Sequence, residues 1–83
     1  MVFQINYKRS VFNDLKKIDR PVAERILHEI ESGIAKNPET GEALTGQFKG
    51  LYKYRVGNWR VIYAILSESV LILRIRHRSV VYQ

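Results

Sequence analysis

The chain has 83 residues, enough for one small domain but too few for a second hydrophobic core. Cysteine is absent, which excludes disulfides and thiolate metal sites, and a hydrophobic fraction of 46% argues against disorder. The first residues alternate apolar and polar, unlike a signal peptide, and no apolar run reaches the roughly 20 residues that cross a bilayer. We therefore expect residues 1–83 to form a single cytoplasmic domain without a membrane partner.

The formal net charge of +6 arises entirely in the second half of the chain. Residues 1–44 hold seven lysines and arginines against seven acids, whereas residues 45–83 hold seven against one acid, Glu68. A basic balance fits nucleic acid, acidic protein or anionic membrane as a partner. Its concentration in one part of the chain favours a binding surface over general solubility.

The first half of the chain predicts one strand and two helices. Residues 2–7 alternate apolar and polar, as a strand does, and Ser10 is a suitable N-cap for a short helix that runs through Ile18. Pro21 fits the first turn of a second helix, which continues to about Ala35 with apolar residues at 3–4 spacing. Each helix therefore has one apolar side to bury.

The second half predicts a loop over residues 36–50 and then strands at about 52–57, 59–66 and 70–76. Gly57-Asn58 between the first two strands is typical of a tight hairpin turn. With that turn, the aromatic and β-branched residues fall on one face. They are Tyr52, Tyr54, Val56, Trp59, Val61 and Tyr63.

The other face of this hairpin carries Lys53, Arg55, Arg60 and Ile62. The turn places Arg55 directly opposite Arg60, and like charges in that relation destabilise a sheet. A polyanion that neutralises the face is the simplest physical reason for keeping such a pair.

The last turn allows two registers for the final strand. A two-residue loop (67–68) would put Arg74 opposite Val61 in the apolar face, where an unpaired guanidinium is costly. A three-residue loop (67–69) puts Arg74 opposite Ile62 and Arg76 opposite Arg60, so we predict this register. It sends Leu71, Leu73 and Ile75 to the core, and it leaves Ile62, Ala64, Val70 and Ile72 beside the cations.

The predicted fold is α+β: an N-terminal strand, a two-helix hairpin and a three-stranded antiparallel meander, with the helices packed on the aromatic face. This order resembles the RelE/ParE superfamily of toxin–antitoxin toxins. The segments that carry the resemblance are Leu44-Thr-Gly46, Gly50-Leu-Tyr-Lys-Tyr-Arg-Val-Gly57, Trp59-Arg-Val-Ile-Tyr63 and Ile75-Arg-His-Arg78 with Val81-Tyr82. RelE-like members cleave mRNA on the ribosome, whereas ParE-like members inhibit DNA gyrase on a similar scaffold.

The resemblance to the RelE branch implies attack of a ribose 2′-hydroxyl on the adjacent phosphate in the ribosomal A site, without metal or cofactor. It matches Lys53, Arg55, Arg60 and Arg76 to that branch's basic active-site positions and Tyr82 to its C-terminal tyrosine. The expected supporting residues for RNA binding are Arg74, His77, Arg78 and Lys49. Arginine suits phosphate because it is a fixed-charge, forked donor.

One position departs from the resemblance. RelE has lysine where Arg55 stands, and arginine is essentially never deprotonated, so it is a poor general base. Lys53 or His77 is then the candidate to accept the 2′ proton.

The apolar residues beside the cations form a patch that needs a cover. They are Ile62, Ala64, Val70 and Ile72. The resemblance implies that an antitoxin with an acidic or amphipathic C-terminal segment covers the patch and the basic site, with the ribosome and mRNA as the other partners. A ParE-like gyrase inhibitor and an inactive binding module on the same scaffold remain alternatives.

Overall fold

The structure is a computed structural model that describes residues 2–80. Two α-helices, α1 (Arg9–Lys16) and α2 (Arg20–Glu29), follow the first strand, and a π-helical turn, Ile30–Ile34, extends α2. The strands are β1 (Gln4–Tyr7), β2 (Glu42–Ala43), β3 (Leu51–Val56), β4 (Trp59–Ile65) and β5 (Ser69–His77). Short 3₁₀ turns lie at Pro38–Thr40, Gly46–Phe48 and Arg78–Val80.

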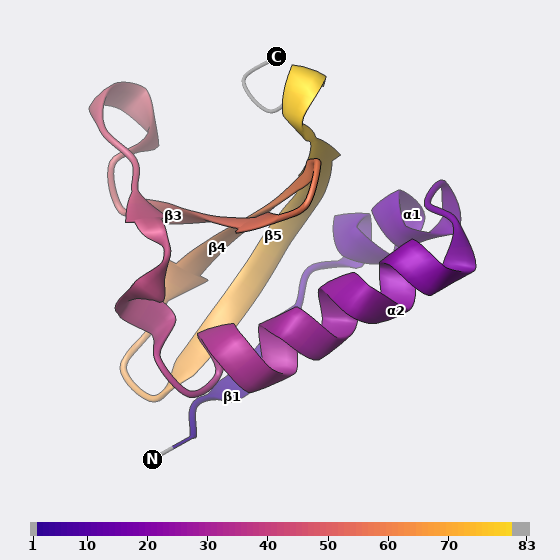
Figure 1. The fold of residues 1–83 in the computed structure, drawn as a ribbon. Helices are drawn as coiled ribbons and strands as arrows, with labels where there is room; N and C mark the ends of the chain where they lie inside the picture. The colour runs from indigo at the N-terminus through magenta and orange to yellow at the C-terminus, as the bar shows by residue number, and fades with distance from the viewer. Residues whose placement is uncertain (1, 81–83) are drawn as a thin grey trace.

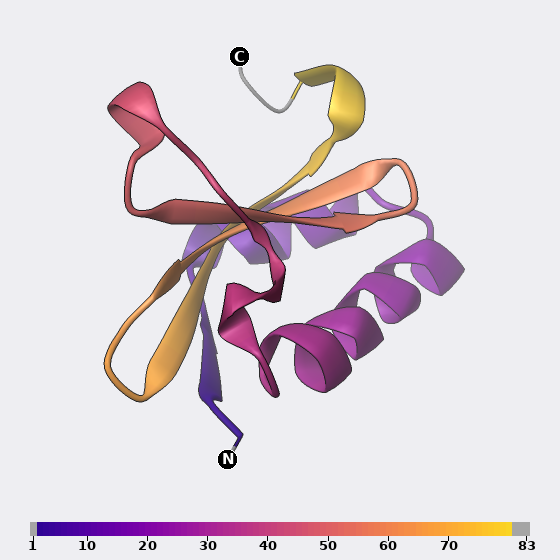
Figure 2. The same ribbon diagram turned by 60° about the vertical axis from the view of Figure 1, so that its left-hand side comes forward.

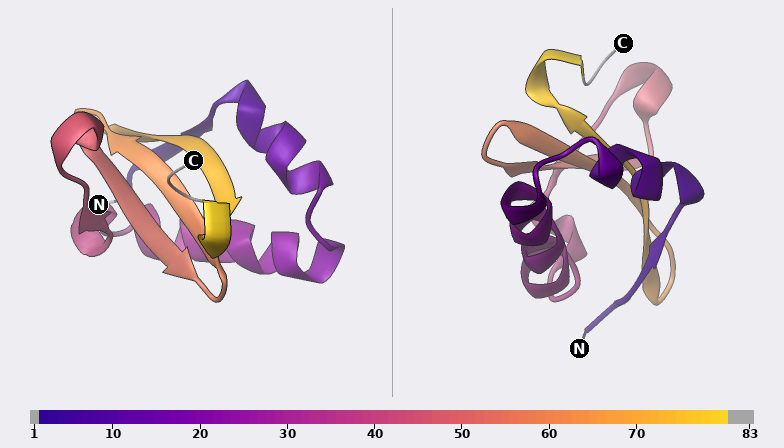
Figure 3. Two further views of the ribbon diagram at one scale, coloured as in Figure 1. Left: turned by 90° about the horizontal axis from the view of Figure 1, so that it is seen from above. Right: turned by 90° about the vertical axis from the view of Figure 1, so that its right-hand side faces the viewer.

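The strands form one sheet in the order β1-β5-β4-β3-β2, in which β1 runs parallel to β5 and the other pairs are antiparallel. Both helices cover the same face of the sheet (Figure 1 and Figure 3). The α+β prediction is confirmed, with one strand more than expected. β2 lies inside the predicted loop, and two residues are too few to show an alternating pattern. Within the described residues, no helix is long and apolar enough to span a membrane.

The core lies between the helices and the covered face of the sheet. Ile26 from α2, with Ile30 and Ile34 from the π turn, packs with residues of β4 and β5. The fully buried sheet residues are Val61, Tyr63, Val70 and Ile72, and Ile75 is almost as well buried. Burying such side chains stabilises the fold by about 1.5–3 kcal/mol each.

The final strand uses both of the registers that its sequence allows. Next to the turn, Ile65 pairs with Val70 and Tyr63 with Ile72, which is the register of the two-residue loop. Beyond an irregularity between Ile62 and Tyr63, Ile62 pairs with Arg74 as predicted. A β-bulge accounts for the change, because its extra residue shifts the pairing by one.

The bulge corrects the predicted patch beside the cations. Val70 and Ile72 are wholly buried in the core, so their predicted place on the outer face of the sheet, the face opposite the helices, is wrong. A shift of one residue exchanges the two faces of a strand, and it acts here only between the turn and the bulge. Leu71, expected in the core, instead pairs with Ala64 and is partly exposed. Ile62 and Ala64 are partly exposed on the outer face, as predicted.

Helix α1 takes over the edge of β5 where β1 ends. The last amide of this ladder is Lys8 N, which donates to Ile72 O at 2.9 Å, and Ser10 Oγ then donates to Leu73 O at 2.8 Å. The prediction that Ser10 caps the helix is therefore wrong: α1 begins at Arg9, and its cap residue Lys8 makes no side-chain capping bond. The hydroxyl is used by a carbonyl more than 60 residues away, which local sequence cannot reveal.

Asp14 completes this edge. Its Oδ2 accepts a hydrogen bond from Ile75 N at 2.9 Å, and its two oxygens accept from Arg74 Nε at 3.0 Å and Nη2 at 2.8 Å. Burial by itself would raise the pKa of Asp14, but the bonds from Arg74 and the Ile75 amide outweigh it and hold the pKa below its usual value. One buried carboxylate thus joins α1 to β5.

The segment before β2 is fixed by Tyr63. Its hydroxyl donates to Pro38 O at 2.6 Å, and burial raises the pKa of Tyr63 to about 12, so the group stays a donor at neutral pH. Gly41 lies against the same hydroxyl, where a β-carbon would collide with it. Only glycine at 41 leaves room for this anchor.

Asp14→Asn should lower the free energy of unfolding by about 2 kcal/mol at pH 7, because it leaves Arg74 without its anionic partner. Since the folded-state pKa of Asp14 is depressed, its contribution is present above the unfolded pKa near 4 and is lost as the pH falls through the folded value. Urea unfolding between pH 7 and pH 2 should show this loss in the parent protein and not in the variant. Glu24→Gln is the control, since it breaks only the exposed pair with Arg20.

Gly41→Ala should destabilise the protein by about 1–3 kcal/mol, because the added methyl group displaces the segment from Tyr63. Tyr63→Phe should cost about 1 kcal/mol through the lost bond to Pro38. Removal of the hydroxyl also relieves the collision, so the double variant should be more stable than the sum of the two changes. Equal and additive losses in a double-mutant cycle would contradict this account of Gly41.

Candidate functional site

Three arginines form a row across the outer face. Arg55 pairs with Arg60 across the β3–β4 hairpin, and Arg60 pairs with Arg76 on β5. Lys53 lies on the same face of β3, two residues before Arg55, and pairs with Ile62. The predicted register is confirmed here, and four of the predicted site residues therefore share one face.

The hairpin turn explains how the row is held. Gly57 has a φ of 58°, which glycine adopts without strain, so the strands reverse within two residues. Arg60 then folds back over the turn, and its Nη1 donates to Gly57 O and Trp59 O, each at 3.0 Å. These two carbonyls offset part of the repulsion from Arg55, which is exposed.

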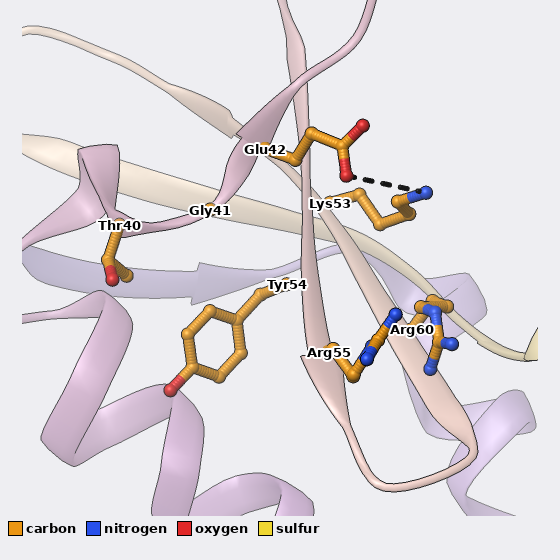
Figure 4. A pocket seen from close by; sticks show the side chains of 7 residues that line it. All are labelled: Thr40, Gly41, Glu42, Lys53, Tyr54, Arg55 and Arg60. Atoms are coloured by element: carbon orange, nitrogen blue, oxygen red, sulfur yellow. Dashed lines mark ion pairs between the residues drawn. The ribbon is translucent and has the colours of Figure 1, made fainter.

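Lys53 faces an acid that the sequence did not single out. Glu42 on β2 is its cross-strand partner, and the distance from Lys53 Nζ to Glu42 Oε1 is 3.8 Å (Figure 4). The Lys53 side chain is 19% exposed and that of Glu42 is 72% exposed, so the carboxylate is the more accessible group. Glu42 was missed because β2 is too short to recognise from sequence, although it is the last acid before the basic half of the chain.

These side chains line one pocket of about 330 Å³ on the outer face. Figure 4 shows Lys53, Arg55 and Arg60 on the same side of the hairpin, while Tyr54 points the other way, toward the helices. The Tyr54 hydroxyl donates to Glu29 Oε1 at 3.1 Å, which fits its predicted place on the helix-facing side. The pocket therefore gathers three cations and one carboxylate from three strands.

Arg74 and His77 lie away from this pocket. Arg74 is paired with Asp14 at the β5 edge, as a supporting part of the fold. His77 is opposite Trp59, with an edge-to-face ring contact at a centroid distance of 5.3 Å, and its Nδ1 is 3.0 Å from Ser79 Oγ. His77 thus lies on the helix-facing side, as the strand alternation predicted.

The remaining predicted residues lie around the site. Lys49 and Arg78 are exposed, in the segments that follow Gly46–Phe48 and β5. Figure 2 shows these two segments rising from the sheet on the side away from α2. Tyr82 lies outside the described residues. Among residues 2–80, no three histidine, aspartate or glutamate side chains are grouped so that they could hold a metal ion.

The comparison with known families points to one assignment. The family model for the ParE toxin of type II toxin–antitoxin systems matches residues 5–82. No curated protein sequence matches the chain at a significant level.

Solved structures with the same fold are toxins of such systems. The RelBE2 toxin–antitoxin complex of Mycobacterium tuberculosis aligns with a TM-score of 0.89 at 22% identity, covering 95% of this chain and 94% of that one. The RelB–RelE complex of Methanococcus jannaschii gives 0.72 at 21% identity, covering 93% and 94%. The YoeB dimer of Staphylococcus aureus gives 0.72 at 21% identity, covering 93% and 98%. With a family match over nearly its whole length, the chain belongs to the ParE toxin family of type II toxin–antitoxin systems, within the RelE/ParE superfamily.

Proposed function

We propose that this toxin is a ribosome-dependent endonuclease that cleaves mRNA in the A site. The observation that supports it is the row of Arg55, Arg60 and Arg76 on one face, beside the pair of Lys53 and Glu42. A gyrase inhibitor that acts by protein contact has no need of these cations together.

The proposed reaction is an internal transesterification. The 2′-oxygen forms a bond to the adjacent phosphorus and the bond to the 5′-oxygen breaks, which leaves a 2′,3′-cyclic phosphate and a 5′-hydroxyl. Negative charge builds up on the phosphate oxygens in the transition state. Arg60, already held by two carbonyls, and the exposed Arg55 are fixed cations that meet this charge without reorganising.

Two proton transfers are needed as well. Arg55 is unsuited to accept a proton, and His77 lies against Trp59 on the other side of the sheet. The pair on β2 and β3 offers both functions in one pocket: the Glu42 carboxylate accepts the 2′ proton, and the Lys53 ammonium donates to the leaving 5′-oxygen. The structure thereby moves the proposed base from Lys53 or His77 to Glu42.

The antitoxin interface is proposed on the same face. Ile62, Ala64 and Leu71 are partly exposed next to the cations, with Leu71 in the place first expected for Val70 and Ile72. An acidic or amphipathic segment of a cognate antitoxin would bury this patch and neutralise the row, and so keep RNA away.

Arg60→Ala should lower the rate of mRNA cleavage about 10²–10³-fold, because one preorganised charge at the phosphate is lost. Glu42→Gln should lower it about 10²–10⁴-fold through loss of the base. The assay uses purified protein, mRNA and 70S ribosomes with an empty A site, read by primer extension, with Arg20→Ala as a matched exposed-arginine control. Absence of ribosome-dependent cuts by the parent protein would refute the endonuclease.

Gyrase inhibition is the second candidate, because the matching family model is that of ParE toxins. A DNA supercoiling assay separates the two. Inhibition of supercoiling by the parent protein, retained in Arg60→Ala and Glu42→Gln, would favour the gyrase target over RNA.

A further inference from the structure

A second basic pocket lies at the opposite edge of the row, where α1 crosses the end of β5. It has a volume of about 180 Å³. Asp14 and Lys17 line it from α1, Trp59 from β4, and Arg74, Arg76 and His77 from β5. None of the steps proposed for the Lys53–Glu42 pocket uses it.

The charges of this pocket are unbalanced. Asp14 is its one carboxylate, and the oxygens of Asp14 are already taken by Arg74 and the Ile75 amide. Within residues 2–80, neither Lys17 nor Arg76 forms an ion pair with an acid. The charge of Arg76 also lowers the pKa of Asp14, which agrees with its position at this edge. Two cations are left to meet an anion from outside.

Arg76 belongs to both surfaces. It ends the row across the outer face as the partner of Arg60, and it lines the edge pocket next to Lys17. The positive surface therefore continues from the outer face over the edge of β5 and onto α1. The Trp59 and His77 rings give this end of the pocket an aromatic wall.

A lysine at the end of a helix also has a purely structural reading, since it meets the negative end of the helix dipole. Lys16 and Lys17 share that reading, because Lys16 is the last residue of α1 and Lys17 is its C-cap. Only Lys17 lines the pocket. The two neighbours therefore form a matched pair for a test.

We propose that the edge pocket binds an RNA phosphate other than the reacting one, with Lys17 and Arg76 as its cations. This deepens the proposed function and rests on it: the strand held at the row leaves the outer face across the end of β5. A phosphodiester fits the site because it accepts the forked bonds of arginine and the point charge of lysine together. Lys17 is thus a positioning residue for the substrate.

The test measures anisotropy of a fluorescein-labelled 12-nucleotide single-stranded RNA with the purified protein between 50 and 200 mM salt. Lys17→Glu should weaken binding about tenfold, and Lys17→Ala should reduce the salt slope by about 0.7, the value for one lost contact to a single strand. Lys16→Glu and Lys16→Ala should change both quantities much less. Equal effects at 16 and 17, or no binding by the parent protein at 50 mM salt, would overturn the inference.

Trp59, the single tryptophan of the chain, gives an independent readout inside the pocket. Its emission should change on titration with the unlabelled RNA, and the change should move to higher RNA concentration in Lys17→Glu but not in Lys16→Glu. Emission that stays constant while the anisotropy reports binding would place the RNA elsewhere and overturn the proposal. Inorganic phosphate, titrated in parallel, shows whether the phosphate group alone suffices or whether the strand is required.

Cleavage on the ribosome separates this inference from the proposed function. Lys17→Glu should raise the toxin concentration for half-maximal cleavage about tenfold and leave the maximal rate unchanged, as expected for a contact made equally before and during reaction. If the parent protein does not cleave, the endonuclease fails, while a Lys17-specific loss of RNA binding would still support the pocket.

Discussion

The structure depends on the contact between Asp14 and the free edge of β5. β1 pairs with β5 only as far as Ile72, so the backbone of β5 beyond that point has no strand on this side. Asp14 takes up the Ile75 amide and balances Arg74 with a single carboxylate. Because Arg76 follows directly, the same contact fixes the end of β5 that carries the last cation of the row. A buried charge of this kind is tolerated only when its bonds are satisfied, and here they are.

The row of arginines illustrates a conflict between folding and binding. Arg55, Arg60 and Arg76 repel one another across three strands, and a sheet selected for stability alone would not place them so. The protein limits the cost locally, since two carbonyls at the turn hold the Arg60 guanidinium. Residues that oppose stability in this way are expected where a ligand supplies the missing charge.

The bulge in β5 resolves a second conflict within one strand. The turn favours a two-residue loop, which puts Val70 and Ile72 into the core, while the far end must keep Arg74 out of it. One extra residue satisfies both requirements, because it shifts the pairing between the two halves. The sequence analysis treated the registers as exclusive, and for that reason it exchanged Val70 and Ile72 with Leu71.

Local patterns in the sequence were sufficient for the helices, the three long strands, the hairpin at Gly57 and the placing of Arg55, Arg60 and Arg76 on one face. They succeed because periodicity and turn chemistry act between near neighbours along the chain. The tertiary structure alone decided the roles of Ser10, Asp14 and Glu42, whose partners lie on other elements. A hydrogen bond from α1 to β5 or an ion pair from β2 to β3 leaves no periodic trace, since it forms only when the packed sheet brings distant residues together.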